Sequence, residues 1–301
     1  MVNHAHEYAN GEVKEHMYAH VYHEGVGKKG ANNVASLIVK MLRQLNLLRD
    51  DSAGGELNII FNNCSGQNKN NTVLKLAVWI KAMGYFKSVN FIFLVVGHTK
   101  NAADRLFNSL KHEYRKDNIF TMEKLLETLN VSDSVTVVPT APDDFWDYDG
   151  LLNDMYKDIS GKVKINHIFS CNSDNPLSMA LDLRKSNLPE HTVDVHNVSK
   201  VRARRFNGPA EVRVHSEKHL KGVRCMGLNP YKVVEMWKNY RPNVPDEFHN
   251  DALYAEPTAD EWSKVKVERG DRSEFRAAQK AKKYAAKEAV ERLAFDMDAA
   301  G

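Results

Sequence analysis

The chain has 301 residues, of which 43% are hydrophobic and 27% are charged, a composition typical of a folded globular protein and not of a disordered one. Its 42 Lys and Arg residues against 39 Asp and Glu give a formal net charge of +3, so any argument for a polyanionic partner depends on local charge. Three widely separated cysteines, Cys64, Cys171 and Cys225, exclude a disulfide framework and a compact zinc module built on paired cysteines.

The amino-terminal segment and the apolar runs bear on the cellular compartment. Residues 1–7 contain neither the basic nor the apolar segment of a secretory signal. The longest apolar run, residues 91–96, is far shorter than the roughly 20 residues that span a bilayer. We therefore expect an intracellular protein with no membrane partner, and the nucleus is one candidate compartment.

Strands and helices alternate through the first half of the chain. Residues 17–22 alternate between apolar and polar side chains, a pattern that favours a strand with an antiparallel neighbour. Residues 89–96 are almost continuously apolar, as in a central strand covered on both faces. In chain order, we expect a strand at 17–22, a helix at 34–48 capped by Asn33, a strand at 57–61, a helix at 73–86, a strand at 89–96 and a helix at 102–116. This alternation predicts parallel pairing in a three-layer α/β domain.

Shorter elements follow, and the character of the sequence changes near Gly161. In chain order, we expect a helix at 122–129, a strand at 135–138, a helix at 151–159, strands at 165–169, 193–198 and 211–215, and a helix at 231–240. Several prolines then mark a linker before an Ala-, Lys- and Glu-rich helix at 272–295. The sequence thus predicts a core domain at 1–160, a smaller α+β region at 161–245, and a linker with a charged helical tail at 246–301.

The glycine-rich segment at 25–30 matches G-x-G-x-x-G between an expected strand and an expected helix. The preceding strand is polar at alternate positions, and the next strand ends in Asn62 and Asn63 where an acid would bind a ribose. A P-loop requires a Ser or Thr directly after its lysine, and neither Lys28 nor Lys29 is followed by one. We therefore favour a solvated turn over a dinucleotide site.

The densest polar segment, residues 62–71, directly follows the expected strand at 57–61. Sites in open α/β sheets form at this end of the strands. Asn and Gln side chains there can also cap a helix or hold a neighbouring loop, so a purely structural role stays open. The residues concerned are Asn62, Asn63, Cys64, Gly66, Gln67, Asn68, Lys69 and Asn70.

Two segments carry a resemblance to a known family. Residues 61–71, Phe-Asn-Asn-Cys-Ser-Gly-Gln-Asn-Lys-Asn-Asn, and residues 96–107, which contain His98, Lys100 and Asn101, resemble a eukaryotic domain-of-unknown-function family with an RNase H-like, transposase-derived core. The resemblance extends from about Tyr18 to Ile168. It implies an RNase H-like three-layer core with a mixed sheet, without its first strand, because few residues precede the strand at 17–22.

The resemblance also implies a site in which three acids hold two divalent ions for phosphodiester chemistry. It places the second acid at Asn62, which is an amide, and the third at Asp104. Glu24 is a weak candidate to replace a missing acid, and Asp104 also fits an ordinary acid near a helix start. An amide supplies no charge to offset two cations. We therefore expect a vestigial site with no metal or other cofactor, and Mg²⁺ or Mn²⁺ only if the site is active.

Basic residues gather in the last third of the chain. One group consists of Lys200, Arg202, Arg204, Arg205, Arg213, Lys218, Lys221 and Arg224, and a second group lies at 264–287 and includes Lys282 and Lys283. Such clusters bind nucleic-acid phosphates, although a solvated basic face has the same pattern. The leading hypothesis is a catalytically inactive, transposase-derived protein that binds DNA or RNA. One alternative is an active metal-dependent DNA nuclease or transposase that uses Glu24 or an acid from outside this chain. The other is a protein-interaction module without a nucleic-acid role.

Overall fold

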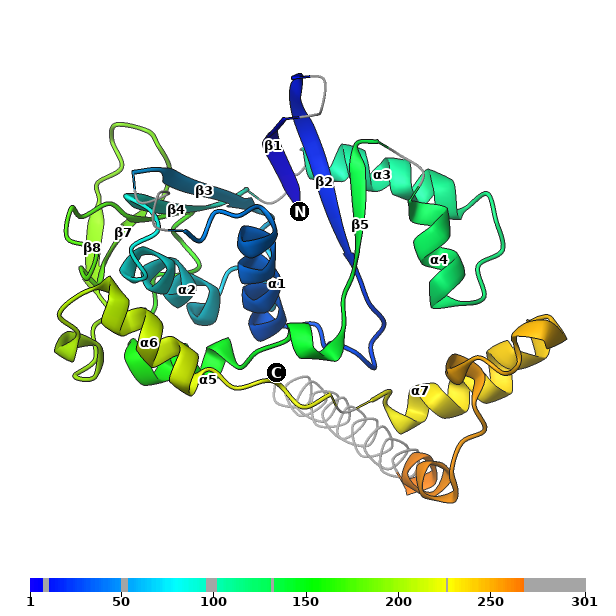
Figure 1. Cartoon of the computed structure of the whole chain (residues 1–301). Coiled ribbons are helices and arrows are strands. Elements are labelled where there is room, and N and C mark those ends of the chain that lie inside the picture. The colour runs from blue at the N-terminus through cyan, green and yellow to red at the C-terminus, as the bar shows by residue number, and fades with distance from the viewer. Residues whose placement is uncertain (8–10, 50–53, 96–101, 131–132, 226, 268–301) are drawn as a thin grey trace, which may run out of the picture. The chain divides into compact units, whose positions relative to one another are not determined.

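The computed structural model describes residues 1–7, 11–49, 54–95, 102–130, 133–225 and 227–267. The chain divides into two compact units, 1–227 and 228–301. The first unit contains two sheets and the helices α1 to α6, and the second contains α7 (Figure 1). In the part of the chain that is described, no helix is both long enough and apolar enough to cross a membrane.

Five strands form the larger sheet, in the order β3-β4-β6-β7-β8. They are β3 (Glu56–Phe61), β4 (Ser88–Phe93), β6 (Ile168–Cys171), β7 (Ala180–Arg184) and β8 (Asp194–Asn197). β3 and β4 are parallel, with Ile59 opposite Phe91 and Phe61 opposite Phe93. The remaining neighbours are antiparallel. The sheet is therefore mixed, as expected, and the predicted parallel pairing of the two apolar segments is confirmed.

Helix α2 (Asn71–Ala82) lies at the centre of the main core. Every residue of α2 except Asn71 is buried, which suits a helix that is apolar on nearly all sides. It packs against β4 and β6 of the sheet and against the helices α1 (Ala31–Gln44) and α5 (Tyr148–Met155). Helix α6 (Pro209–His219) joins this core through Ser216, whose Oγ accepts a hydrogen bond from Trp79 Nε1 at 2.9 Å.

A second, three-stranded sheet has the order β1-β2-β5. β1 (Val2–Glu7) is antiparallel and β5 (Val135–Pro139) is parallel to β2 (Val13–Val21). The helices α3 (Ala102–Tyr114) and α4 (Met122–Leu129) contribute Leu110 and Leu129 to a small core with Met17 and Ala19 of β2. Both edges of β2 are hydrogen-bonded, so β2 cannot also pair with β3. The expected single three-layer core is therefore not observed.

Several element bounds differ from the sequence-based expectation. α1 begins at Ala31 after Gly30, so Asn33 lies inside the first turn and is not the cap. β4 ends at Phe93, and Val95, expected in this buried strand, is 53% exposed. The strand expected at 211–215 is wrong, because these residues belong to α6, whose Pro209 occupies the first turn that proline favours.

The expected boundary near Gly161 does not coincide with the division between the units. Strand β6 follows that position and pairs with β4, and β7 and β8 extend the same sheet. Residues 161–197 therefore complete the sheet that β3 and β4 begin. The helix expected at 272–295 lies outside the described residues.

The second unit contains the helix expected at 231–240. α7 (Pro230–Glu235) continues into a π-helical turn, Met236–Tyr240. Short 3-10 helices follow in this unit at Arg241–Asn243, Asp246–Phe248 and Ala252–Tyr254. The first unit also contains 3-10 helices, at Pro142–Asp144 and Ala203–Arg205. Arg241 stacks 4.5 Å from the ring centre of Trp237, and Lys238 lies 4.6 Å from that of Trp262. Cation–π contacts thus connect the helical turns of this unit.

Candidate nucleic-acid interface

The polar loop after β3 is held by its own amide side chains. Asn62, the residue at the expected position of an acid, is exposed, and its Oδ1 accepts a hydrogen bond from Asn68 Nδ2 at 2.6 Å. Asn70 caps α2, because its Oδ1 accepts from the Val73 amide at 3.1 Å. Its Nδ2 donates to the Gln67 carbonyl at 3.0 Å. These bonds close the loop on itself and start the central helix.

Two further residues connect this loop to the segment after α5. Lys69 is only 4% exposed, and its ammonium donates to the Lys164 carbonyl at 3.0 Å and lies 5.9 Å from the Phe93 ring centre. Burial lowers the pKa of Lys69. Asn71 Oδ1 accepts from the Ile159 amide at 2.9 Å. Asn68, Lys69 and Asn70 thus have partners within the protein. The Cys64 carbonyl accepts hydrogen bonds from the backbone amides of Gln67, Asn68 and Lys69, and Asn63 and Gly66 lie in the same loop.

The other expected acids belong to other elements. Asp104 is exposed in the first turn of α3, which packs against β2, whereas Asn62 follows β3 of the larger sheet. Glu24 is exposed in the turn after β2. In the described part of the chain, no cluster of three or more His, Cys, Asp or Glu side chains has a metal-binding arrangement. His98, Lys100 and Asn101 lie outside the described residues, as do Lys282 and Lys283.

The glycine-rich segment forms a closely packed turn between β2 and α1. A Cβ atom on Gly27 would lie 2.6 Å from the ring of Phe145. The Cys225 thiol donates to the carbonyl of Gly25, whose amide donates to His23 Nδ1 at 3.0 Å. Close packing against an aromatic ring therefore accounts for glycine at position 27.

A basic pocket, defined here by Asp154, Lys157, Ser199, Lys200, Val201, Arg202 and Arg204, lies beside the end of α5 and has a volume of about 330 Å³. Backbone bonds fix its two walls together. The Lys157 amide donates to the Val198 carbonyl at 2.7 Å, and the Lys200 amide donates to the Met155 carbonyl at 3.3 Å. Ala203, which is 1% exposed, anchors the second wall in the core. Backbone hydrogen bonds and burial of Ala203 thus hold the two walls of the pocket in place.

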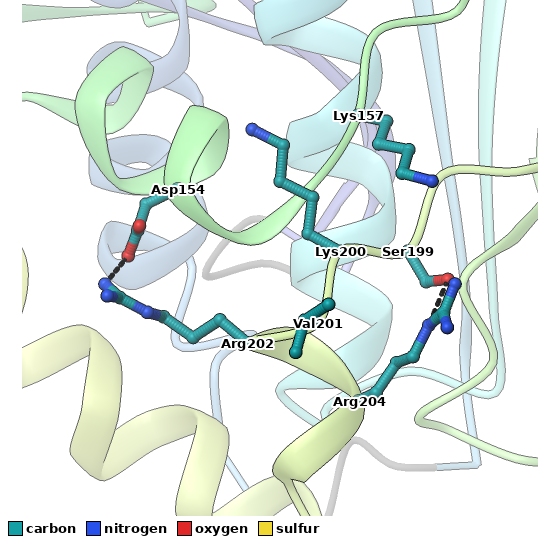
Figure 2. A pocket seen from close by; sticks show the side chains of 7 residues that line it. All are labelled: Asp154, Lys157, Ser199, Lys200, Val201, Arg202 and Arg204. Carbon is teal, nitrogen blue, oxygen red and sulfur yellow. Dashed lines mark hydrogen bonds and ion pairs between the residues drawn. The ribbon is translucent and has the colours of Figure 1, made fainter.

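Figure 2 shows how the polar side chains of the basic pocket are arranged. Arg202 forms an ion pair with Asp154, and Arg204 Nε donates to Ser199 Oγ at 3.0 Å. The Lys200 ammonium donates to the Asn153 carbonyl, and the exposed Lys157 side chain extends on the side where Arg204 lies. Four cationic groups and one carboxylate line the pocket, so it attracts an anion.

Neighbouring basic residues extend this charge along the surface. Arg205 is exposed next to the pocket, and Arg213 on α6 stacks 4.9 Å from the ring centre of Tyr85. His215 on α6 stacks on His219, with ring centres 4.1 Å apart. Burial, followed by the charges of His219 and Arg202, lowers the pKa of His215. Of the basic residues expected to bind nucleic acid, Lys200, Arg202 and Arg204 line the pocket itself.

Sequence reasoning did not single out Asp154, Lys157 and Ser199. The Lys200 bond to residue 153 and the Arg202 bond to Asp154 join positions 47 and 48 residues apart. No local pattern around Lys157 marks it as a partner of the later basic segment. In the folded chain, an isolated bridge between Tyr156 and Ser199 brings the two segments together, along with the side-chain bonds of Lys200 and Arg202.

Comparison with known proteins gives one match. A family model described as Domain of unknown function (DUF7869) matches residues 4–189, more than half of the chain. No curated protein and no solved structure matches the chain. The matched region contains the α5 side of the basic pocket and ends before its second wall, at Ser199–Arg204.

Proposed function

We propose that the chain, which belongs to the DUF7869 family, binds nucleic acid through the basic pocket and the basic residues around it. The observation that carries the proposal is that Lys157, Lys200, Arg202 and Arg204 line one hollow, in which Asp154 is the single carboxylate among the described residues. Arg and Lys side chains contact phosphates and release condensed counterions, which favours binding to DNA or RNA of any sequence.

The surroundings of the basic pocket support contact with a backbone rather than with bases. Arg205, Lys218, Lys221 and Arg224 are exposed near it in the sequence and extend the positive charge. Among the described residues, Val201 is the one apolar side chain that lines the pocket, and none of those that line it is aromatic. Stacking of bases on aromatic rings is therefore a minor contribution, and little sequence preference is expected.

We further propose that the core descends from an RNase H-like, transposase-derived protein with a degenerate metal site. The two motif segments described above support this origin, as does the parallel pairing of β3 and β4, which the first motif directly follows. Asn62 accepts a hydrogen bond from Asn68 and brings no negative charge to the site. Nucleic-acid binding without strand cleavage is the function that this arrangement supports best.

Salt-dependent binding tests the proposed function. The full chain is titrated with a labelled single-stranded oligonucleotide at several salt concentrations, and log affinity should fall nearly linearly with log salt. Lys157→Gln should weaken binding and reduce the slope by about 0.7 for the lost phosphate contact. Lys87→Gln is the matched control, because Lys87 is also an exposed lysine but lies before β4 and does not line the pocket.

The outcomes separate the three classes of function. Binding that is absent, or insensitive to salt, would contradict the proposal and favour a protein-interaction module. Incubation of the same strand with Mg²⁺ or Mn²⁺ should leave it intact. Metal-dependent cleavage that is lost in Asp104→Ala would instead identify an active nuclease.

A further inference from the structure

We infer that the basic pocket receives the terminal phosphate of a nucleic-acid strand, a refinement that rests on the nucleic-acid binding proposed above. The relevant distinction is between a phosphate at a strand end and one inside the backbone. Both are anions, but they differ in charge and in the space that they require. The shape and the charge of the basic pocket favour the strand end.

The shape is that of a hollow between two walls. The last turn of α5 supplies Asp154, the residues after α5 supply Lys157, and the segment Ser199–Arg204 supplies the facing wall. The volume of about 330 Å³ is at the lower end of small-molecule sites, which begin at about 300 Å³. A terminal phosphate with its nucleotide fits such a hollow, whereas an internal phosphate needs a groove in which the strand continues in both directions.

The charges suit a dianion. A phosphomonoester carries a charge of about −1.5 to −2 near neutral pH, against −1 for an internal phosphodiester. Asp154 already pairs with Arg202, so the remaining positive charge comes from Lys157, Lys200 and Arg204. Arg204 uses Nε to contact Ser199, and a guanidinium carries further N–H groups that can donate to a phosphate as a pair.

The rim supplies an apolar surface for the rest of the terminal nucleotide. Val201 is 66% exposed and lines the same hollow as the cationic groups. Its methyl groups offer a contact for a sugar or a base edge without reading the sequence. The basic pocket therefore combines a recognition site for the phosphate with a sequence-neutral contact beside it.

The experiment compares oligonucleotides of one sequence that carry a phosphate at either end or hydroxyl groups at both ends. Affinities for the full chain are measured by anisotropy at one salt concentration. The strand with a phosphate at the preferred end should bind about three- to tenfold more tightly than the hydroxyl-ended strand, since a partly exposed charge pair has a modest effect. The double variant Lys157→Gln with Arg204→Gln should remove this ratio.

The matched control is the double variant Lys218→Gln with Lys221→Gln, which removes two exposed cations outside the basic pocket. It should weaken binding of all strands equally and keep the ratio. Inorganic phosphate is added in a separate series to distinguish a free ion from a strand end. It should displace the phosphate-ended strand only at concentrations far above that of the unlabelled strand itself.

The outcomes test nucleic-acid binding and recognition of the terminal phosphate separately. Salt-dependent binding with equal affinity for all strands would overturn the terminal-phosphate site and leave nucleic-acid binding intact. A ratio that survives in the Lys157 and Arg204 double variant would place the end-binding site elsewhere. Displacement by inorganic phosphate as efficient as by the strand would make the pocket a free-anion site. Absence of binding by every strand would overturn both proposals.

Discussion

The ammonium of Lys75, a residue of α2 that is only 2% exposed, donates a hydrogen bond to Asn153 Oδ1 at 2.6 Å. The same lysine forms an ion pair with Asp158, whose side chain is 65% exposed. The backbone carbonyl of Asn153 accepts a bond from Lys200 in the basic pocket. A buried lysine in the core thus holds the end of α5 on which one wall of the pocket depends.

Replacement of Lys75 by Met should therefore affect both stability and binding. We expect the free energy of unfolding to fall by about 1–2 kcal/mol, because charge-assisted hydrogen bonds are lost while Asp158 stays solvated. Oligonucleotide affinity should fall a few-fold as Asn153 loses its support. Urea unfolding and anisotropy titration measure the two effects. Lys81→Met is the control, because Lys81 is also a buried lysine of α2 but lies near Cys171 and Asp174. A loss of oligonucleotide affinity in Lys81→Met would argue against a specific link between Lys75 and the basic pocket.

The pH dependence of stability should reflect His20 on β2. Burial lowers the pKa of His20 to about 4, and neither ring nitrogen has a hydrogen-bond partner among the described residues. The unfolded chain binds a proton at this residue below about pH 6.5, whereas the folded chain does so only near pH 4. Stability should therefore fall as pH decreases through this window, by roughly 3 kcal/mol from this group.

The variant His20→Leu tests this assignment by removing the titrating ring. Chemical unfolding at several pH values should give a flatter dependence of the unfolding free energy between about pH 6.5 and pH 4 than in the unmodified chain. His112→Leu, at an exposed position of α3, should leave the dependence unchanged. An identical slope in His20→Leu and the unmodified chain would assign the acid sensitivity to other groups.

Binding of nucleic acid should also depend on pH through His215. The lowered pKa of this residue arises from burial and from the nearby charges of His219 and Arg202, while Asp154 opposes the shift. His215 is therefore neutral near pH 7 and becomes positive only under more acidic conditions than an ordinary histidine. Protonation adds positive charge beside the basic pocket, so oligonucleotide affinity should rise as the pH falls.

Anisotropy titrations at constant ionic strength measure this effect. In His215→Gln the rise should be smaller, because this variant lacks the His215 ring that stacks on His219 and gains a proton as the pH falls. His112→Gln again serves as the control at a distant helix. Affinity that is independent of pH in the unmodified chain would show that the histidine pair does not influence the site.

The sequence predicted the correct element where the local residue pattern and the packing of the folded chain favour the same secondary structure. The continuous apolar runs predicted the parallel pair in which Phe61 lies opposite Phe93. The same approach failed at 211–215, where alternating residues resemble a strand but form α6. The decisive interaction there is long-range, since Ser216 bonds Trp79 across 137 positions. The two walls of the basic pocket also meet only in the folded chain, so the sequence indicated Lys200, Arg202 and Arg204 of one wall and not Lys157 of the other.

The contact between α2 and α6 gives a last prediction, which concerns Gly84. This residue follows the end of α2 with φ +78, a conformation that favours glycine, and a Cβ atom there would lie 2.7 Å from Pro209 Cβ at the start of α6. Gly84→Ala should therefore lower the free energy of unfolding by about 1–3 kcal/mol, through backbone strain and displacement of α6.

Gly66→Ala provides the matched control for this test. A Cβ atom on Gly66 has no neighbour within 4 Å, and its φ does not lie in the left-handed region. We expect a change of less than about 0.5 kcal/mol there, because surface substitutions that create no strain have small effects. Urea unfolding of the two variants gives the comparison. Equal stability of both would show that α6 does not approach the end of α2 as closely as the structure places it.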